Sequence, residues 1–154
     1  MDDMKHDPSN DSSGDAIEAY VLDEQIGYAL RKANQRHMTI FGEKMLDGLT
    51  PTQFSALFRL VESPGPQSQN ALGRSVAMDA ATIKGVVNRL EARGLVMSRK
   101  DEVDRRRYVI EATAKGRELI KAAMPVMAEI TEATMAPLTV AERRTILRLL
   151  AKLS

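Results

Sequence analysis

The sequence contains no cysteine and no tryptophan, and only three phenylalanines, three tyrosines and two histidines. Without cysteine the chain can form no disulfide, zinc finger with cysteine ligands or thiol nucleophile. The two histidines, His6 and His37, lie far apart in the sequence, and we therefore expect no metal site. Nothing in the composition points to a cofactor, and none is expected.

Two further absences narrow the class of protein. No apolar run approaches the length of a membrane-spanning helix, about 18 residues, so no membrane association is expected. The sequence has no GxSxG, phosphate-binding loop or HExxH motif, and we expect a protein that is not an enzyme. The chain of 154 residues, with 44% hydrophobic and 28% charged side chains, is long enough for one globular domain with its own core.

Charge is distributed unevenly along the chain. The net charge is only +1, and so the total indicates no particular partner. Residues 1–15 contain five aspartates and one lysine, a net charge of −4; we expect a disordered acidic tail that does not resemble a signal peptide, and a cytoplasmic location. Residues 84–107 contain eight basic and four acidic side chains, a net charge of +4, which favours an acidic partner there.

Residues 67–116 contain the most informative pattern, two short helices joined by a tight turn. Ser68 is expected to cap the first helix and Asp79 the second. Ala77 and Met78 form the turn between them. In the second helix the apolar residues recur at helical spacing and are expected to face the core: Ile83, Val87 and Leu90.

A charged β-hairpin is predicted next. Gly94 ends the second helix, residues 95–100 form one strand, and the second strand is indicated by alternation along residues 108–112. Tyr108, Ile110 and Ala112 alternate there with Val109 and Glu111. A helix pair followed by a basic hairpin is typical of a winged helix-turn-helix, in which one helix enters the major groove and the wing reaches the backbone or minor groove.

Helices are expected on both sides of this reading head, which we define as residues 50–112. A long helix spans about residues 23–46. A second helix, from Pro51 to Glu62, follows the cap Thr50, and its expected buried residues are Phe54, Leu57, Phe58 and Val61. Further helices are expected over about residues 113–135 and after Thr139. The predicted fold class is mainly α with a small β-hairpin: a single winged helix-turn-helix domain over residues 16–154, with dimerisation helices over about 16–47 and 113–154.

The terminal helices carry more apolar surface than the reading head can cover. Leu149, Leu150 and Leu153 at the end of the chain would be exposed in a monomer. A two-fold homodimer built from the terminal helices would bury them. The alternative is a monomer whose terminal helices pack on each other.

Over about residues 23–153 the chain resembles the MarR (multiple antibiotic resistance regulator) family of winged-helix repressors. The resemblance rests on the terminal helices and on three segments, LTPTQFSAL, SQNALGRSVAMDAATIKGVVNRLEARGLVMSRK and DRRRYVIEATAKG. It implies a dimeric transcription regulator with a ligand pocket where the dimerisation helices meet the reading head. Two features depart from the family: the wing loop DEVD lacks a proline often found there, and Ala112 replaces a larger aliphatic residue. The segment LDEQIGYALRKANQRHMTIF resembles a subgroup that controls catabolism of aromatic acids or their thioesters.

The candidate contacts to double-stranded DNA lie on the two short helices and the wing. Asn88 can read adenine and Arg89 guanine through paired hydrogen bonds, while Lys84 is expected at a phosphate. Ser68 and Gln69 can bind a phosphate at a helix start. The full set is Ser68, Gln69, Thr82, Lys84, Asn88, Arg89, Asp104, Arg105, Arg106 and Arg107. The alternatives are a solvated helix face and, for Ser68, capping alone.

In the wing, strand alternation would place Arg105 and Arg107 on one face and Arg106 on the other. The resemblance implies that Asp104 and Arg106 are the signature pair of the wing, and we expect Asp104 to orient an arginine. At least one arginine is expected to enter the minor groove or to touch a phosphate. The alternative is a solvated charge run, or pairing of the arginines with the acidic residues of the loop.

All three phenylalanines fall on the first two helices, and His37 lies on the apolar stripe of the first. These residues are candidates for an aromatic-lined pocket that binds a small aromatic carboxylate: Arg31, His37, Phe41, Phe54 and Phe58, with Arg59 as another candidate anchor for the anion. The alternative is an ordinary core with a satisfied histidine.

Three functions are open to a chain with this sequence. The first is a ligand-responsive DNA-binding regulator, a repressor that binds a palindromic operator as a homodimer and is released by a small aromatic acid or its thioester. The second is an enzyme, for which no motif is present. The third is a protein-interaction module on a winged-helix scaffold without ligand control, which would have little need for three consecutive arginines in the wing.

Overall fold

The computed structural model describes Ile17 and residues 19–154, so the expected acidic tail, residues 1–15, lies outside the described residues. The chain divides into two compact units, Met1–Arg36 and His37–Ser154.

The described part of the first unit is helical. It contains a 3-10 helix, η2 (Leu22–Glu24), and the first part of helix α2 (Ile26–Lys44). One helix was expected over about residues 23–46, but Gln25 has an extended backbone (φ −84, ψ 125) that separates η2 from α2. Ile26 and Leu30, on the predicted apolar stripe, are exposed.

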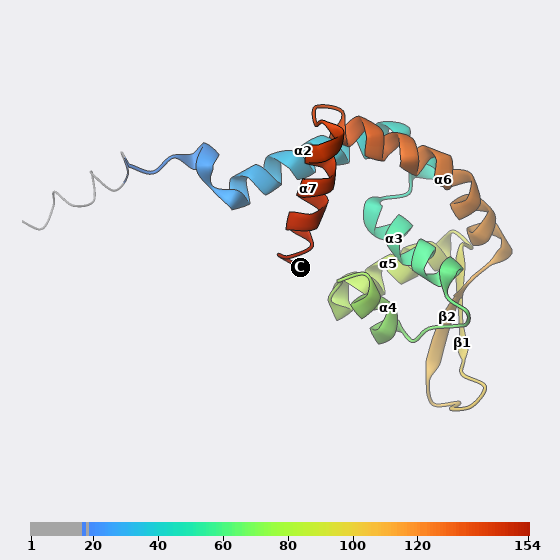
Figure 1. Cartoon of the computed structure of the whole chain (residues 1–154). Coiled ribbons are helices and arrows are strands. Elements are labelled where there is room, and N and C mark those ends of the chain that lie inside the picture. The colour runs from blue at the N-terminus through green and yellow to red at the C-terminus, as the bar shows by residue number, and fades with distance from the viewer. Residues whose placement is uncertain (1–16, 18) are drawn as a thin grey trace, which may run out of the picture. The chain divides into compact units, whose positions relative to one another are not determined.

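The second unit confirms the predicted fold class, mainly α with a small β-hairpin (Figure 1). After the end of α2 its elements are η3 (Leu46–Gly48), α3 (Pro51–Glu62), α4 (Gln69–Ser75), α5 (Ala80–Ala92), β1 (Val96–Lys100), β2 (Tyr108–Ala112), α6 (Ala114–Met135) and α7 (Val140–Leu150). Pro125 lies inside α6 without interrupting it.

The helices from α3 onward begin at the predicted positions because polar residues cap them. At each start a side-chain oxygen accepts a hydrogen bond from a backbone N–H of the first turn; the capping residues are Thr50, Ser68, Asp79, Thr113 and Thr139. The first and last of these caps are capping boxes, completed by Gln53 and Glu142.

The turn between α4 and α5 depends on a close backbone approach. A Cβ at Gly73 would lie 3.1 Å from the carbonyl oxygen of Met78 and 3.2 Å from Cγ2 of Ile83. Ala77 has a positive φ of 53°, and the Met78 N–H donates to the Gly73 carbonyl at 2.9 Å. The predicted turn at Ala77 and Met78 is therefore confirmed.

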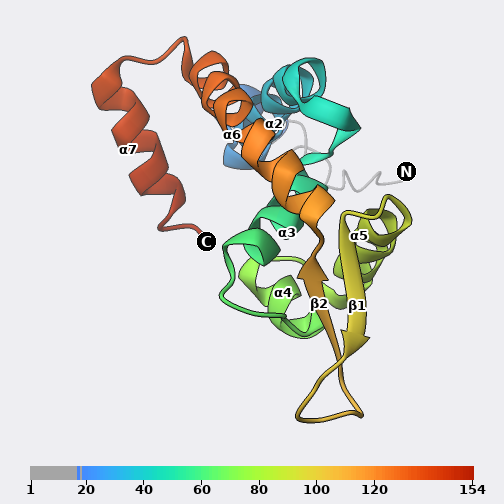
Figure 2. The ribbon, with the colours of Figure 1, turned by 90° about the vertical axis from the view of Figure 1, so that its right-hand side faces the viewer.

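The hairpin projects beyond α4 and α5 (Figure 2). Its strands are antiparallel, with Val96 opposite Ala112 and Lys100 opposite Tyr108. Gln67 pairs with the other side of β2, a contact that was not predicted: its N–H donates to the Ile110 carbonyl at 2.9 Å, and its carbonyl accepts the Ile110 N–H at 2.7 Å. Because Gln67 is the only residue of its segment that pairs with β2, the sequence around it has no strand-like alternation that could have predicted the contact.

The core lies among α3, α5, α6 and the hairpin, and α3 packs against α5, α6 and β2. The expectation for α3 was partly wrong: Leu57 is buried, but Phe54, Phe58 and Val61 are only half-buried. The other buried residues of α3 are Gln53, Ala56 and Leu60. The buried stripe is therefore rotated from the expected one, and it leaves the two phenylalanines at its edge. Helix α7 has no buried residue.

Candidate nucleic-acid interface and aromatic cluster

Helix α5 has one buried and one exposed side, as expected for a reading helix. Its buried side consists of Ile83, Val86, Val87 and Leu90. Lys84, Asn88 and Arg89 are exposed on the remaining surface. Among the described residues their side chains form no hydrogen bond or ion pair, so these groups are free to bind a partner.

The start of α5 is fixed by Asp79. Its Oδ1 accepts the backbone N–H of Thr82 at 2.7 Å. This bond and a second one from the Thr82 hydroxyl lower the pKa of the Asp79 carboxyl. Thr82, a predicted DNA contact, is exposed but its hydroxyl is already engaged in the cap.

One exposed residue of this helix was missed. Ala81 is exposed and lies four positions before Gly85 and seven before Asn88, a spacing that places all three on one helix face. Its methyl group is of the kind that contacts a thymine methyl in the major groove. Helical spacing alone could have identified it.

The wing loop, residues 101–107, is folded by Asp101. Its Oδ1 accepts the backbone N–H groups of Val103 at 2.8 Å and Asp104 at 3.2 Å, and its own N–H donates to the Arg107 carbonyl at 2.9 Å. The two accepted bonds lower the pKa of the Asp101 carboxyl, with a smaller contribution from the charge of Arg107.

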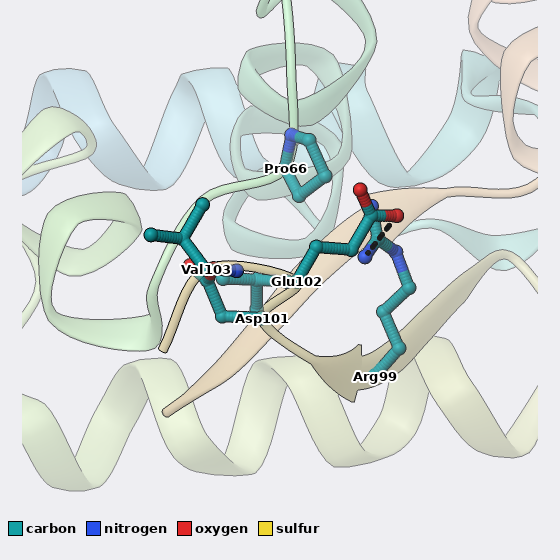
Figure 3. A pocket seen from close by; sticks show the side chains of 6 residues that line it. Pro66, Arg99, Asp101, Glu102 and Val103 are labelled. Atoms are coloured by element: carbon teal, nitrogen blue, oxygen red, sulfur yellow. Dashed lines mark hydrogen bonds and ion pairs between the residues drawn. The ribbon is translucent and has the colours of Figure 1, made fainter. Parts of the chain in front are cut away.

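Arg99 braces the base of the loop (Figure 3). Its guanidinium pairs with Glu102 in the loop at 3.2 Å, as Figure 3 shows, and with Glu111 on the opposite strand at 3.0 Å. Arg99 and Glu102 border a cavity of 190 Å³, whose other lining residues are Pro66, Asp101, Val103 and Val109. The Arg99–Glu102 pair thus ties the loop to β1.

The three wing arginines lie within this loop and precede β2, so the expected strand alternation of Arg105, Arg106 and Arg107 is wrong. Among the described residues, the side chains of Arg105 and Arg106 form no ion pair. Asp104 orients the main chain rather than a guanidinium: its carboxylate accepts the Arg106 N–H at 3.1 Å. The loop therefore presents at least two uncompensated cations.

Ser68 and Gln69 stand at the start of α4, and both are partly exposed. The Ser68 hydroxyl accepts the N–H of Ala71 at 3.2 Å. Capping is therefore observed for Ser68, and the phosphate contact of both residues stays a prediction.

The structure brings four of the five predicted ligand-binding residues together. The rings of His37 and Phe41 lie 5.9 Å apart, those of Phe41 and Phe54 6.5 Å, and those of Phe54 and Phe58 5.9 Å. The fifth, Arg31, belongs to the other unit and lies over the ring of Tyr28, 5.5 Å from its centre.

Polar groups lie at both ends of this aromatic cluster. At one end His37 Nδ1 lies 3.1 Å from the hydroxyl oxygen of Thr134 in α6, a partner 97 positions away that no local pattern could reveal. At the other end Phe54 and Phe58 border a cavity of 390 Å³, whose other lining residues are Ser55, Arg59, Ser75 and Val76. Arg59 pairs with Glu62 and is exposed on one side of this cavity.

The described residues include no helix with the length and apolar character needed to cross a membrane. They also include no group of three or more histidine or acidic side chains that could hold a metal ion.

Comparison with known proteins places this geometry in a family. The model of the MarR family matches residues 49–108, most of the reading head. The chain is 44% identical over 135 residues to the HTH-type transcriptional repressor NicR of Pseudomonas putida, covering 87% of this chain and 85% of NicR.

Two solved structures are similar along nearly the whole described chain. A probable transcriptional regulator from Pseudomonas aeruginosa has a TM-score of 0.84 and 48% identity, covering 87% of this chain and all (100%) of that one. Bordetella bronchiseptica BpsR, whose DNA binding is regulated by 6-hydroxynicotinic acid, has a TM-score of 0.81 and 38% identity, covering 87% of this chain and 96% of BpsR. Together with the capped helix pair and the basic wing, these similarities show that the chain belongs to the MarR family and is a transcriptional regulator of that type.

Proposed function

We propose that this regulator is a ligand-responsive repressor that binds a palindromic operator as a homodimer and is released by a small aromatic acid or its thioester. The observation that carries the DNA-binding part is the set of uncompensated cations on the reading helix and wing. Lys84, Arg89, Arg105 and Arg106 are all exposed and unpaired within the described chain. Such cations gain most of their binding free energy by displacing counterions from phosphates.

The effector class follows from the aromatic cluster and its polar ends. Phenylalanine rings supply apolar area for a planar ring, and a histidine or arginine supplies an anchor for a carboxylate. The cavity of 390 Å³ beside Phe54 and Phe58 has the size of a small-molecule site. NicR is named a repressor and BpsR responds to 6-hydroxynicotinic acid, which makes a hydroxylated pyridine carboxylate the first compound to test.

In this proposal the effector acts by shifting the equilibrium between two conformations of the dimer. The effector would bind better to a conformation whose reading helices are wrongly spaced for the operator, and affinity for DNA would fall by the coupling factor, about 5- to 150-fold. The chain has no catalytic motif, and its relatives are named as regulators, in agreement with a binding function.

The test is selection of bound genomic fragments by the full chain, repeated with a panel of aromatic acids that includes 6-hydroxynicotinic acid. We expect recovery of a palindromic fragment that binds with strong salt dependence and is released by a member of the panel. His37→Ala should bind the fragment but respond poorly to the acid. Met38→Ala, which changes the next and more exposed residue (45% exposed), serves as the matched control and should respond normally.

Two results would overturn the proposal. Failure to bind any duplex at low salt would favour the protein-interaction module. Equal release of wild type and His37→Ala would return His37 to a structural role, in contact with Thr134 and Phe41.

A further inference from the structure

Arg93, at the C-terminal cap of the reading helix α5, binds a segment that lies far from it in the sequence. Its guanidinium donates to the carbonyl oxygen of Asp47 at 2.6 Å, to the Asp47 carboxylate at 2.7 Å and to Oε1 of Gln53 at 3.3 Å. We call residues 46–53 the α2–α3 corner. The side chain of Arg93 is 27% exposed, so these bonds are partly shielded from water.

The corner has two features that make this contact directional. Asp47 has a positive φ of 53°, a conformation that is rare for residues with a side chain. Gln53 is the one buried polar residue of the described chain, 7% exposed, and its Oε1 also accepts the N–H of Thr50 at 3.2 Å. A planar guanidinium that satisfies all these acceptors fixes both distance and orientation, unlike the apolar contacts around it.

Arg93 also holds the chain that follows α5. Its carbonyl oxygen accepts a hydrogen bond from Lys115 in α6 at 2.9 Å, and the next carbonyl, of Gly94, accepts one from the Thr113 hydroxyl at 2.7 Å. One residue thus links the end of the reading helix to the corner on one side and to α6 on the other.

We infer that Arg93 is a positioning residue for DNA reading, which couples the placement of α5 to the α2–α3 corner. Phe41 precedes the corner and Phe54 follows it directly, so the aromatic cluster brackets it in the sequence. A displacement of either ring by an effector would move the corner, and Arg93 would pass this movement to α5. The effector part of this inference rests on the proposed function.

Coupling is reciprocal, so it can be measured from the DNA side without any effector. DNA bound to α5 should stabilise the corner through Arg93. We would measure amide hydrogen exchange of the corner in the full chain, with and without a duplex recovered by the genomic selection. In wild type we expect the duplex to slow exchange of the corner by at least about fivefold.

The test variant is Arg93→Gln, which removes the charge and the planar fork. We expect the duplex to bind about tenfold more weakly and, at saturating duplex, to leave exchange of the corner unchanged, while α5 itself is still protected. The matched control is Arg117→Gln, because Arg117 also bonds across elements, to the Val61 carbonyl at 3.3 Å, but does not contact the corner. It should keep the wild-type response.

A second variant covers the case in which Arg93→Gln does not fold. Asp47→Gly removes the acceptor carboxylate and adopts the positive φ without strain, so it should fold and respond to DNA less than wild type does, while the two remaining acceptors keep part of the response. Two results would overturn the inference. In one, DNA slows amide exchange of the corner equally in wild type and in the folded variants. In the other, DNA does not slow exchange of the corner in wild type.

The effector arm separates the two proposals. With 6-hydroxynicotinic acid, wild type should release the duplex and Arg93→Gln should bind the acid without release. If no aromatic acid releases the wild type but DNA still protects the corner through Arg93, effector control fails and the positioning role stands.

Discussion

At single positions, the fold depends on backbone approaches that leave no room for a side chain. Gly116, in the first turn of α6, is the tightest of these. A Cβ there would lie 2.1 Å from the carbonyl oxygen of Leu95, which also accepts the N–H of Thr113 at 3.0 Å. Any side chain would push α6 away from the start of the wing.

We therefore predict that Gly116→Ala lowers the free energy of unfolding by about 2–4 kcal/mol, because neither backbone segment can yield cheaply. Urea denaturation followed by circular dichroism measures this change. Gly42→Ala is the control: nothing lies within 4 Å of a Cβ there, and the substitution should stabilise the helix by about 0.5–1 kcal/mol. Equal effects of the two substitutions would show that the approach at Gly116 is not rigid.

The exposed side chains of α5 should divide into base-reading and phosphate-binding groups. Asn88→Ala or Arg89→Ala should relax sequence preference and cost about 1–3 kcal/mol at the base that each reads. Lys84→Ala should weaken binding to all duplexes alike. Anisotropy titrations with the selected duplex and single-base variants distinguish these outcomes, and an Arg89→Ala variant with unchanged affinity and preference would show that the reading face has been assigned wrongly.

At the scale of elements, the wing loop is ordered by the Asp101 carboxylate, which accepts the backbone N–H groups of Val103 and Asp104. Asp101→Ala should free the N–H groups of Val103 and Asp104 and lower DNA affinity about five- to tenfold, because binding must then order the loop. The slope of log K against log salt concentration should not change, since no phosphate contact is lost.

Arg106→Ala should instead reduce this slope by about one if Arg106 meets a phosphate.

Binding isotherms at several salt concentrations, with melting temperatures measured in parallel, test the wing. If Arg106→Ala lowers the melting temperature and leaves the slope unchanged, Arg106 has a structural role. Asp101→Ala could also change the salt dependence of DNA binding as much as Arg106→Ala does. The Asp101 carboxylate would then act on the DNA through its charge and not by ordering the loop.

Three exposed carboxylates at helix starts and in the wing link stability to pH. Hydrogen bonds from backbone N–H groups lower the pKa of Asp79, Asp101 and Glu142 below their usual values. A lowered pKa in the folded state adds stability that is present above the unfolded-state value, about 4, and is lost as pH falls through the lower folded value. We predict a loss of stability below about pH 4, measured by urea unfolding across this range. Asp79→Asn keeps the cap without a titrating group, so its acid dependence should be shallower; an unchanged dependence would exclude Asp79 as a contributor.

The same elements show what the sequence could and could not predict. Helix starts were predictable because a cap is a local signal: Thr50, Asp79 and Thr139 each bond within their own first turn. The buried side of α3 was predicted wrongly. Phe54 and Phe58 are four positions apart, as are Ala56 and Leu60, so helical spacing fits either pair. Only the packing of α3 against α5 and α6 decides which pair is buried. Long-range contacts leave no local pattern in the sequence. Arg93 and Asp47 are separated by 46 positions, and His37 and Thr134 by 97 positions.

For the whole molecule, the apolar surface that remains exposed in one chain is the strongest sign of self-association. Helix α7 has no buried residue, and Leu147 and Leu153 are 57% and 69% exposed. An amphipathic helix gains little from folding unless its apolar side is covered, and a second copy of the same helix can cover it. We therefore keep the homodimer as a prediction.

If the dimer forms through α7, Leu147→Glu should yield a monomer, because burying an unpaired carboxylate in an apolar interface costs several kcal/mol. Sedimentation at micromolar concentration measures the change, and Leu147→Met, which preserves volume and apolarity, should remain dimeric. The dimer should bind two half-sites whose centres lie about 10 bp apart, one helical turn. Leu147→Glu should bind the full site no more tightly than an isolated half-site, since only one reading helix then engages. A wild-type chain that sediments as a monomer, or that binds a half-site as tightly as the full palindrome, would contradict the dimer and require another partner for the leucines of α7.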